Sequence, residues 1–257
     1  MSRPHLEQVP AMVELRQYLL HRRRRDELIE LFDREFVDTQ EALGIRVIGQ
    51  FRDIDRVNHF VWLRAFSDQA SRRESLASFY SGPAWRKHGR AAASTMIDSS
   101  DVHQLRGTAV DRELRIRRAG CRNTAGNRGS IAIIVSHRRD EHDDEHDELI
   151  RRYLIPEVEQ AGFRTVGLYA TDPTENAYPA LPVRASSVLV WMGAAESTDA
   201  LDTAAHHVAI ARERLAEQAE TSNRAEFLLD VLRLEPTDQS CLNGTDVEAD
   251  AAPSGRH

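Results

Sequence analysis

Two short phrases occur twice, in the same order, in this 257-residue chain. Asp-Glu-Leu-Ile at residues 26–29 recurs at residues 147–150. Gly-Ile-Arg-Val-Ile-Gly at residues 44–49 has the counterpart Gly-Phe-Arg-Thr-Val-Gly at residues 162–167. An apolar, strand-like run precedes each first phrase, and a helix-like stretch separates the two phrases. A repeat of about 120 residues is too long for a solenoid unit, so the sequence predicts two domains of similar fold.

The composition fits a globular protein and argues against several kinds of partner. Hydrophobic residues make up 41% of the chain and charged residues 29%, and the net charge of −7 gives no electrostatic basis for binding nucleic acid. No apolar stretch approaches the roughly 20 residues of a membrane span, and the N-terminus shows no apolar signal-peptide core. Cys121 and Cys241 suggest neither a disulfide framework nor a metal motif. We therefore expect no membrane or nucleic-acid partner and a cytoplasmic location.

Hydrophobic periodicity gives the first copy the order βαββαβ. Residues 12–20 alternate between apolar and polar side chains, as a half-buried strand does. Leu28, Phe32 and Phe36 recur at helical spacing, and Gly44 is well placed to end that helix. We expect strands at residues 12–20, 45–53, 58–66 and 101–106, and helices at residues 24–43, 69–80 and 84–95.

The second copy repeats this order, and Pro156 inside its first helix predicts a kink or an early end near Ile155. Residues 107–129 are rich in arginine and are expected to form an exposed linker. The alternative is an arm for nucleic acid or an acidic partner, which no interleaved aromatic residues support. The polar tail, residues 236–257, is expected to be disordered. We expect strands at residues 130–137, 163–171, 186–193 and 226–234, and helices at residues 143–160 and 198–219.

The βαββαβ order is the ferredoxin-like pattern. Such a unit covers one face of its sheet with helices and leaves the other face bare. Two units can pack their bare faces together or align their edges to close a barrel. The sequence therefore predicts one ferredoxin-like domain at residues 12–106 and a divergent one at residues 130–235, joined as a pseudo-dimer within one chain. Further association into a homodimer stays open.

Four runs in the first copy resemble the NIPSNAP family. They are Val-Glu-Leu-Arg-Gln-Tyr at residues 13–18, Gly-Gln-Phe at 49–51, Phe-Val-Trp-Leu-Arg at 60–64 and Phe-Tyr-Ser-Gly-Pro-Ala-Trp at 79–85. The second copy keeps the layout but lacks the last run. The resemblance implies the dimeric α/β-barrel superfamily. The fold class we expect is therefore α+β, with two tandem ferredoxin-like (βαββαβ) domains forming an intramolecular dimeric α/β-barrel. Superfamily relatives include cofactor-free monooxygenases, polyketide cyclases, haem-handling enzymes and small-molecule sensors.

Charged and aromatic side chains share one face of the strands in the first copy. Glu14, Arg16 and Tyr18 alternate along the first strand, and Trp62 and Arg64 along the third. We expect this face to look into the barrel and to enclose a small aromatic or acidic molecule. Further side chains expected near this site are Trp85, His88 and His103.

Each of these residue types suits a role in such a site. Arg16 or Arg64 would bind a carboxylate or enolate, Tyr18 and the tryptophans would supply stacking surface, and a histidine would act as a general base. An ion-pair network of Glu14 with the two arginines, filling the space between the sheets, is the structural alternative. Trp85 would then be a core anchor.

The second copy adds His137 and Trp191. His137 ends a strand where pockets of the superfamily often open, so it joins Arg16, Arg64 and His103 as a candidate catalytic residue. Trp191 is a candidate for binding the ligand. His142 and His146 would share a helix face as metal-ligating pairs do, but a solvated helix start explains them as well, and no metal site is predicted.

The sequence holds no nucleophile elbow, phosphate-binding glycine loop or dinucleotide fingerprint, and no cofactor is expected. Three functions stay open. The first is a cofactor-independent enzyme of acid–base or oxygenase/cyclase type, acting on a small aromatic or polyketide-like molecule. The second is a binding protein with the same pocket and no chemistry. The third is an interaction protein whose barrel interior is solid.

Overall fold

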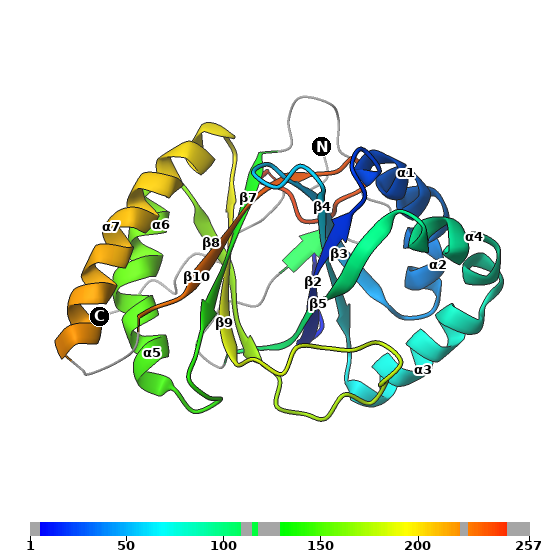
Figure 1. Ribbon diagram of the computed structural model, residues 1–257, viewed down its shortest axis with the longest axis horizontal. Helices are drawn as coiled ribbons and strands as arrows, with labels where there is room; N and C mark the ends of the chain where they lie inside the picture. Colours follow the sequence, from blue (N-terminus) through cyan, green and yellow to red (C-terminus); the bar gives the residue numbers. More distant parts are fainter. Residues whose placement is uncertain (1–5, 109–114, 118–128, 222–225, 246–257) are drawn as a thin grey trace.

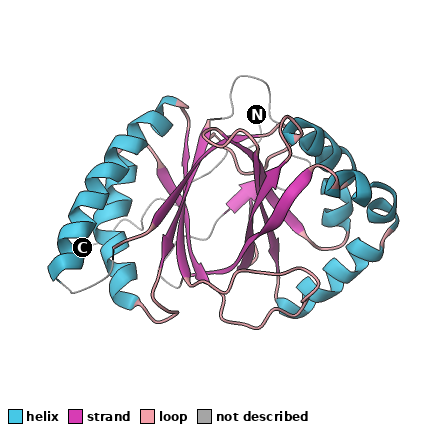
Figure 2. Cartoon of the chain, in the orientation of Figure 1, coloured by secondary structure: helices cyan, strands magenta, loops and turns pink. Residues whose placement is uncertain are grey.

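The computed structural model describes residues 6–108, 115–117, 129–221 and 226–245. Eight strands form one closed antiparallel barrel in the order β10-β3-β4-β2-β5-β8-β9-β7. Helices pack against the outside of this barrel in two groups, on opposite sides (Figures 1 and 2). The protein is therefore an α+β structure with an eight-stranded barrel at its centre.

The first half of the chain follows the expected order. The helix predicted at residues 24–43 is two helices, because the chain breaks at Phe36, whose ring packs against both Phe79 and Trp85 at 5.5 Å between centroids. The last strand begins at Met96, earlier than predicted. The elements are β2 (Met12–Leu20), α1 (Arg25–Glu35), α2 (Val37–Ala42), β3 (Arg46–Asp53), β4 (His59–Phe66), α3 (Gln69–Ser81), α4 (Pro83–Ala93) and β5 (Met96–Gly107).

The second half keeps the order with a modified first helix. A π-helical turn, η1 (Ile150–Leu154), separates α5 (Asp144–Leu149) from α6 (Ile155–Gln160). Pro156 lies in the first turn of α6, directly after this π-helical turn, so the regular helix is interrupted near Ile155. The remaining elements are β7 (Ser130–His137), β8 (Arg164–Thr171), β9 (Val188–Ala195), α7 (Asp199–Thr221) and β10 (Leu229–Pro236).

The repeated glycine phrase has the same structural meaning in both halves. Gly44 follows α2 with φ +80°, and Gly162 follows α6 with φ +97°, so each ends a helix in the left-handed conformation that favours glycine. Gly49 and Gly167 lie where the strand register shifts, and a Cβ at either would lie 2.5 Å from an aromatic ring two residues further on. The phrase thus encodes a helix stop followed by a bulged strand.

Two segments predicted to be irregular contain ordered structure. In the linker, β6 (Arg115–Arg117) pairs with β1 (Leu6–Gln8), and Ile116 is buried against the barrel core. At the start of the tail, the N–H of Leu242 donates to the Ile48 carbonyl at 2.8 Å, and the Leu242 side chain is fully buried. Residues 237–245 are therefore part of the fold. The rest of both segments lies outside the described residues.

Cys241 departs from the expectation that the two cysteines suggest no disulfide framework. Its side chain is buried in the same core as Leu242, and it is disulfide-bonded. Cys121 is the only other cysteine in the sequence, and it lies outside the described residues.

The barrel interior is a packed apolar core to which all eight strands contribute. Its members include Val13, Leu15, Phe51, Leu63, Leu105, Ile133, Val166, Tyr169, Val190, Met192 and Leu232. Because strand side chains alternate between two faces, the residues between these members point away from the interior, toward the helices. The interior is thus filled mainly by apolar side chains, with Gln17 and His103 as buried polar members.

This alternation overturns one prediction about the candidate site. Glu14, Arg16, Tyr18, Trp62 and Arg64 do not look into the barrel. They face outward, and Tyr18 and Trp62 belong to a second apolar cluster built with α1 to α4. Sequence periodicity separates the two faces of a strand but does not say which face is inside. The closed interior takes the more apolar of the two faces, on which Gln17 and His103 are buried polar side chains.

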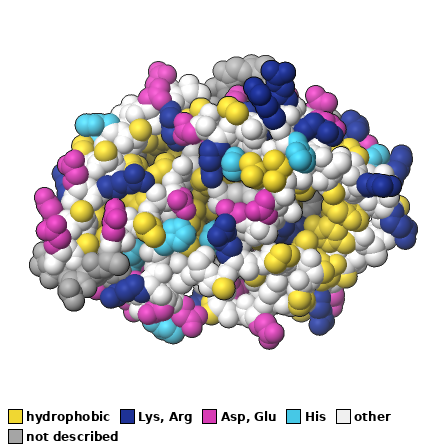
Figure 3. Space-filling model, in the orientation of Figure 1, with side chains coloured by type: hydrophobic (Ala, Val, Ile, Leu, Met, Phe, Trp, Pro, Cys, Tyr) yellow, Lys and Arg dark blue, Asp and Glu magenta, His cyan; other side chains and the backbone are white. Residues whose placement is uncertain are grey.

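Two features of the described residues concern the expectation of no nucleic-acid and no membrane partner. Charged side chains of both signs are interspersed on the face shown in Figure 3. Among the helices of the described residues, none is both long and apolar enough to cross a membrane.

The packing of Leu242 at the start of the tail should contribute to stability. Replacing the buried Leu242 with alanine should lower the free energy of unfolding by about 2–5 kcal/mol, because it opens a cavity at the edge of the barrel core. Urea denaturation followed by circular dichroism measures this change. Leu228, which is 60% exposed, is the matched control, and its alanine variant should change stability by less than about 0.5 kcal/mol. Equal small effects at both positions would show that this segment is not packed as described.

Candidate functional site

A cavity of about 170 Å³ lies between the outer face of β2 and β4 and the helices α1 to α4. We call it the aromatic cavity. Its aromatic lining consists of Tyr18, Phe32, Phe36, Trp62, Phe79, Tyr80 and Trp85, and its other lining residues are Arg16, Leu28, Gln40, Ala93, Met96, Ser99 and Leu181.

The local sequence explains why these rings meet. Tyr18 and Trp62 are outward-facing residues of neighbouring strands, and their ring centroids lie 6.0 Å apart. Phe32 on α1 packs edge-on against Trp62 at 4.8 Å. Tyr80 and Trp85 flank the short break between α3 and α4, which brings their rings to 4.6 Å. Edge-to-face packing of this kind fixes the walls of the cavity.

A buried ion cluster supports one side of the cavity. The Glu14 carboxylate accepts hydrogen bonds from Arg16 Nη1 at 2.8 Å, Arg64 Nε at 2.6 Å and Arg72 Nε at 2.6 Å. None of the four side chains is more than 2% exposed. With three guanidinium groups and one carboxylate, the cluster carries a net charge of +2. We call it the arginine cluster.

The arginine cluster sets the protonation state of its own carboxylate. Burial alone would raise the pKa of Glu14, but Arg64, Arg16 and Arg72 outweigh burial and hold that pKa well below its ordinary value. Burial also raises the pKa of Tyr80, which lines the cavity. At neutral pH the site therefore contains an ionised Glu14 and a protonated Tyr80 hydroxyl.

Several donors of the site have unused hydrogen-bonding capacity. Arg16 donates through Nη1 to Glu14 and through Nε to the Tyr18 hydroxyl, which leaves Nη2 without a partner in the described part of the chain. Arg64 Nη2 and Trp62 Nε1 are buried and have no partner among the described residues. Unpaired buried donors are costly, so an acceptor that entered the cavity would be bound favourably.

The other residues predicted for the site are placed elsewhere, apart from Trp85, which lines the cavity. His88 lies on α4 with Nε2 3.2 Å from Glu35 and does not line the cavity. Trp191 lies under the second helical layer and donates from Nε1 to Thr165 Oγ1 at 2.9 Å. Neither side chain is positioned to contact a molecule in the aromatic cavity.

The two candidate catalytic histidines lie together at one end of the barrel, away from the cavity. His137 Nε2 is 2.9 Å from Asp230, and His103 is buried on β5, 3.7 Å from Asp101. Burial lowers the pKa of His103 to about 4, so its imidazole is neutral at physiological pH. Neither histidine can therefore serve as a general base for a molecule in the aromatic cavity.

A larger, open pocket of about 590 Å³ lies beside His137, between the loop that follows β7 and the loop between β8 and β9. Its arginines are already paired: Arg138 with Asp147, Arg139 with Asp143, and Arg184 with Asp101. We place the candidate site in the smaller aromatic cavity because its walls are aromatic and its arginine cluster has unbalanced charge.

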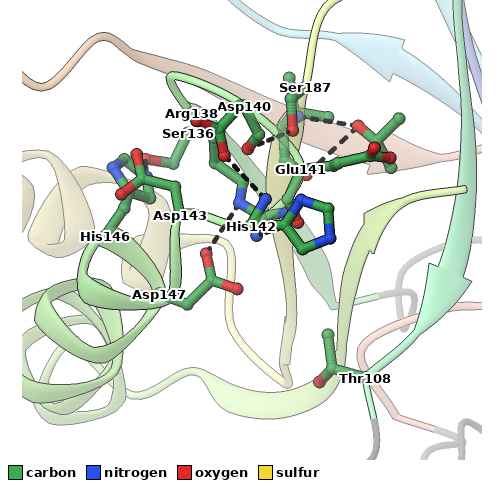
Figure 4. A network of polar contacts seen from close by, with 12 residues as sticks. Thr108, Ser136, Arg138, Asp140, Glu141, His142, Asp143, His146, Asp147 and Ser187 are labelled. Carbon is green, nitrogen blue, oxygen red and sulfur yellow. Dashed lines mark hydrogen bonds and ion pairs between the residues drawn. The ribbon is translucent and has the colours of Figure 1, made fainter. Parts of the chain in front are cut away.

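The two histidines of the second half, His142 and His146, have different surroundings. His146 is buried, 2.7 Å from Ser136 Oγ and stacked on Phe227, whereas His142 is exposed (Figure 4). Across the described residues, no group of three or more His, Cys, Asp or Glu side chains could hold a metal ion. His146 thus helps to pack the β7–α5 connection.

Sequence reasoning missed several residues of the site. Arg72 completes the arginine cluster from α3, and Leu181 reaches the cavity from the loop between β8 and β9. Phe32 and Phe36, four residues apart on one helix face, and the pair Phe79-Tyr80 were visible as aromatic signals. No local signal marks Arg72 or Leu181, because each reaches the site only through tertiary packing.

The comparisons with known proteins agree with this geometry. The NIPSNAP family model matches residues 13–110, which hold Glu14, Arg16, Trp62, Arg64 and Trp85. Residues 13–110 are a NIPSNAP domain. The resemblance read from the sequence is thereby confirmed, and the aromatic cavity is built mainly from residues of this NIPSNAP domain. No curated protein matches the chain.

Solved structures extend the likeness to the whole fold. A monooxygenase candidate from Fusobacterium nucleatum subsp. nucleatum is similar over 92% of this chain and 97% of its own, with 10% identity and a TM-score of 0.52. An anthrone oxidase-like protein is similar over 96% and 100%, with 11% identity and a TM-score of 0.52. A NIPSNAP-like domain protein from Burkholderia xenovorans matches 39% of this chain and 88% of its own, with 25% identity and a TM-score of 0.36. At the identities of the first two, the likeness concerns the fold.

The buried carboxylate provides a direct stability test. Glu14→Gln should lower the free energy of unfolding by about 3–5 kcal/mol at pH 7, because three buried guanidinium groups lose their counter-charge. The folded-state pKa of Glu14 is lowered, so its stabilising effect is present above the unfolded pKa and declines as the pH falls below about 4.5. The difference between the variant and wild type should therefore stay constant from pH 7 to 5 and shrink in more acidic buffer.

Urea titrations over this pH range measure that difference. Glu30→Gln is the control, because Glu30 is an exposed glutamate on α1. A difference that does not depend on pH in acid would contradict the assigned role of Glu14.

Proposed function

We propose that the protein binds a small aromatic anion in the aromatic cavity and acts on it without a cofactor, by acid–base or oxygenase/cyclase chemistry. The observation that carries this proposal is the junction of an aromatic-lined cavity with a buried cluster of net charge +2. Aromatic walls select a flat molecule, and the arginine cluster selects negative charge.

The volume of the cavity limits the size of the ligand. An engineered protein cavity of about 150 Å³ accommodates benzene. At about 170 Å³, the aromatic cavity suits one substituted ring. A phenol, a hydroxybenzoate or a compact β-ketone fits this limit, whereas a fused three-ring compound does not fit without movement of the walls.

Charge favours the ionised form of such a ligand. A buried cluster with two uncompensated positive charges is costly, and an anion beside it offsets part of that cost. Arg16 is the lining residue of the cluster, and its free Nη2 would donate to a carboxylate, phenolate or enolate oxygen. Arg64 and Arg72 would act at longer range through the shared Glu14 carboxylate.

Proton transfer in the cavity would fall to its tyrosines. Tyr18 and Tyr80 both line the space, and the Tyr18 hydroxyl already accepts a hydrogen bond from Arg16 Nε at 2.9 Å. Such a hydroxyl keeps its own proton free to donate to a ligand oxygen. Stabilising an enolate or phenolate in this way makes an adjacent carbon nucleophilic toward a carbonyl group or dioxygen.

The organisation of the whole chain belongs to the same proposal. We read residues 12–106 and 130–235 as two ferredoxin-like units of an intramolecular dimeric α/β-barrel, joined by residues 107–129, of which only the first carries the site. Each half places helices on the outer face of its own strands. A cytoplasmic location stays a prediction. The disulfide at Cys241 argues against it, because disulfides are rare in cytosolic proteins.

A non-catalytic role is the second candidate. The apolar filling of the barrel interior is the feature expected of a protein-interaction module, and the aromatic cavity would serve ligand binding without turnover equally well. Mass spectrometry and nuclear magnetic resonance of the ligand after long incubation separate binding from catalysis, since only an enzyme converts the ligand into a product of different mass or structure.

Binding of salicylate and its neutral analogue salicyl alcohol tests the proposal. Wild-type protein should bind salicylate more tightly, and Arg16→Gln should weaken salicylate binding by about tenfold or more, because a charge-assisted hydrogen bond is lost. The effect on salicyl alcohol should be small. Fluorescence titration measures both affinities, and Arg90→Ala, at an exposed arginine of α4, is the control. Equal affinity for the two compounds in wild type would contradict the anion site.

Oxygen uptake tests the chemistry separately. Chelator-treated wild-type protein should accelerate the consumption of dissolved oxygen by hydroquinone, and Arg16→Gln should remove most of the acceleration. Salicylate binding without any acceleration of this reaction, and without mass change in other phenols or β-ketones, would favour the binding role.

A further inference from the structure

The loop between β8 and β9, residues 172–187, crosses from the second half of the chain to the helices of the first half. We call it the strap. In Figure 1 it is the yellow-green segment that runs below the barrel toward α3. Backbone hydrogen bonds tie both of its ends to β5: the N–H of Asp172 donates to the Gln104 carbonyl at 2.9 Å, and the N–H of Arg184 donates to the Val102 carbonyl at 2.8 Å.

The middle of the strap is fixed through Asn176. Its Oδ1 accepts from Arg72 Nη1 at 2.8 Å and from its own loop at the Tyr178 N–H at 3.0 Å. Its Nδ2 donates to the Leu181 carbonyl at 2.9 Å. A single side chain therefore shapes the loop and fastens it to α3 of the NIPSNAP domain.

Two apolar side chains of the strap meet the candidate site. Leu181 lines the aromatic cavity, although it lies in the second half of the chain. The Tyr178 ring stacks on Tyr80, with 6.3 Å between centroids and 16° between planes, and Tyr80 is itself a wall of the cavity. Both strap residues pack against the apolar cluster of the first half.

We propose that the strap is the cover of the aromatic cavity, and that Leu181 is the residue that sets the largest ligand the cavity accepts. The inference rests on the proposed function, since it assigns specificity to the same site. It also gives the divergent second half a role: the pocket under its own helices has no aromatic lining, but its strap supplies one wall of the aromatic cavity.

The strap is also joined to the charge of the site. Arg72 binds Asn176 through Nη1 and Glu14 through Nε at 2.6 Å, so one guanidinium links the loop to the arginine cluster. Removal of the Asn176 amide frees the middle of the loop and leaves Arg72 bound to Glu14 and beside the side-chain amide of Gln104. The expected consequence is a shorter residence time of the ligand rather than a loss of the charge that attracts it.

The test compares salicylate with the larger 1-hydroxy-2-naphthoate, two anions with the same carboxylate and phenol. Wild-type protein should favour salicylate. Leu181→Ala should shift the ratio of the two dissociation constants by about tenfold toward the naphthoate, because one large side chain leaves the cavity wall. Asn176→Ala should raise the dissociation rate of salicylate in stopped-flow experiments. Ala180→Leu, at an exposed neighbouring position of the strap, should leave the ratio unchanged.

Each outcome has a distinct meaning. An unchanged ratio in Leu181→Ala, with tight salicylate binding retained, would overturn the role of the strap and leave the proposed function standing. Wild-type protein that binds neither anion would overturn both. Thermal denaturation shows whether each variant is folded, and Leu181→Met, which preserves volume, should behave as wild type.

Discussion

The carboxylate of Glu14 accepts hydrogen bonds from three guanidinium groups in a part of the structure that water does not reach. These bonds connect β2, β4 and α3, so they fix the distance at which the helices stand from the sheet. The aromatic cavity occupies the space between these helices and the sheet. If the carboxylate were absent, like charges would repel one another at the point where these elements meet.

The same cluster explains why the two halves of the chain differ. The second half places Ile134, Leu189 and Trp191 under its own helices, where apolar packing is joined by isolated polar contacts, such as that of His146 with Ser136. In the first half, ion pairs join the strands to the helices at one end of the interface, and aromatic rings pack between them at the other end. The aromatic cavity lies beside both. The two halves can differ in this way because each keeps the stop glycine and the strand bulge that the glycine phrase encodes.

Much of the framework could be predicted from local patterns, and the site only in part. Alternation in Met12–Leu20 and the helix-stop glycines Gly44 and Gly162 are local signals, and the structure follows them. The grouping of Arg16, Tyr18, Trp62 and Arg64 was also visible, since they share a strand face. Whether that face points into the barrel or toward the helices was not visible, because the alternation of side chains is the same for both faces. From the sequence alone, Leu15 and Arg16 were therefore equal candidates for the barrel interior. Only the closed barrel, which excludes water from one face, places Leu15 inside.

Contacts between distant segments account for the residues that were missed. Arg72 and Leu181 lie on a helix and a loop whose sequences give no sign of a site. Arg72 reaches Glu14 when α3 packs on the strands of the first half, and Leu181 reaches the cavity from the second half. The histidines His103 and His137 show the converse error. Their chemistry suited catalysis, but strand register carries both to the end of the barrel, away from the aromatic rings.

A crystal structure of the protein grown with salicylate tests the central claim most directly. The account predicts the aromatic ring among Tyr18, Trp62 and Trp85, with the carboxylate within hydrogen-bonding distance of Arg16 Nη2 and Leu181 in van der Waals contact with the ligand. Salicylate bound in the open pocket beside His137, with the aromatic cavity empty, would contradict it.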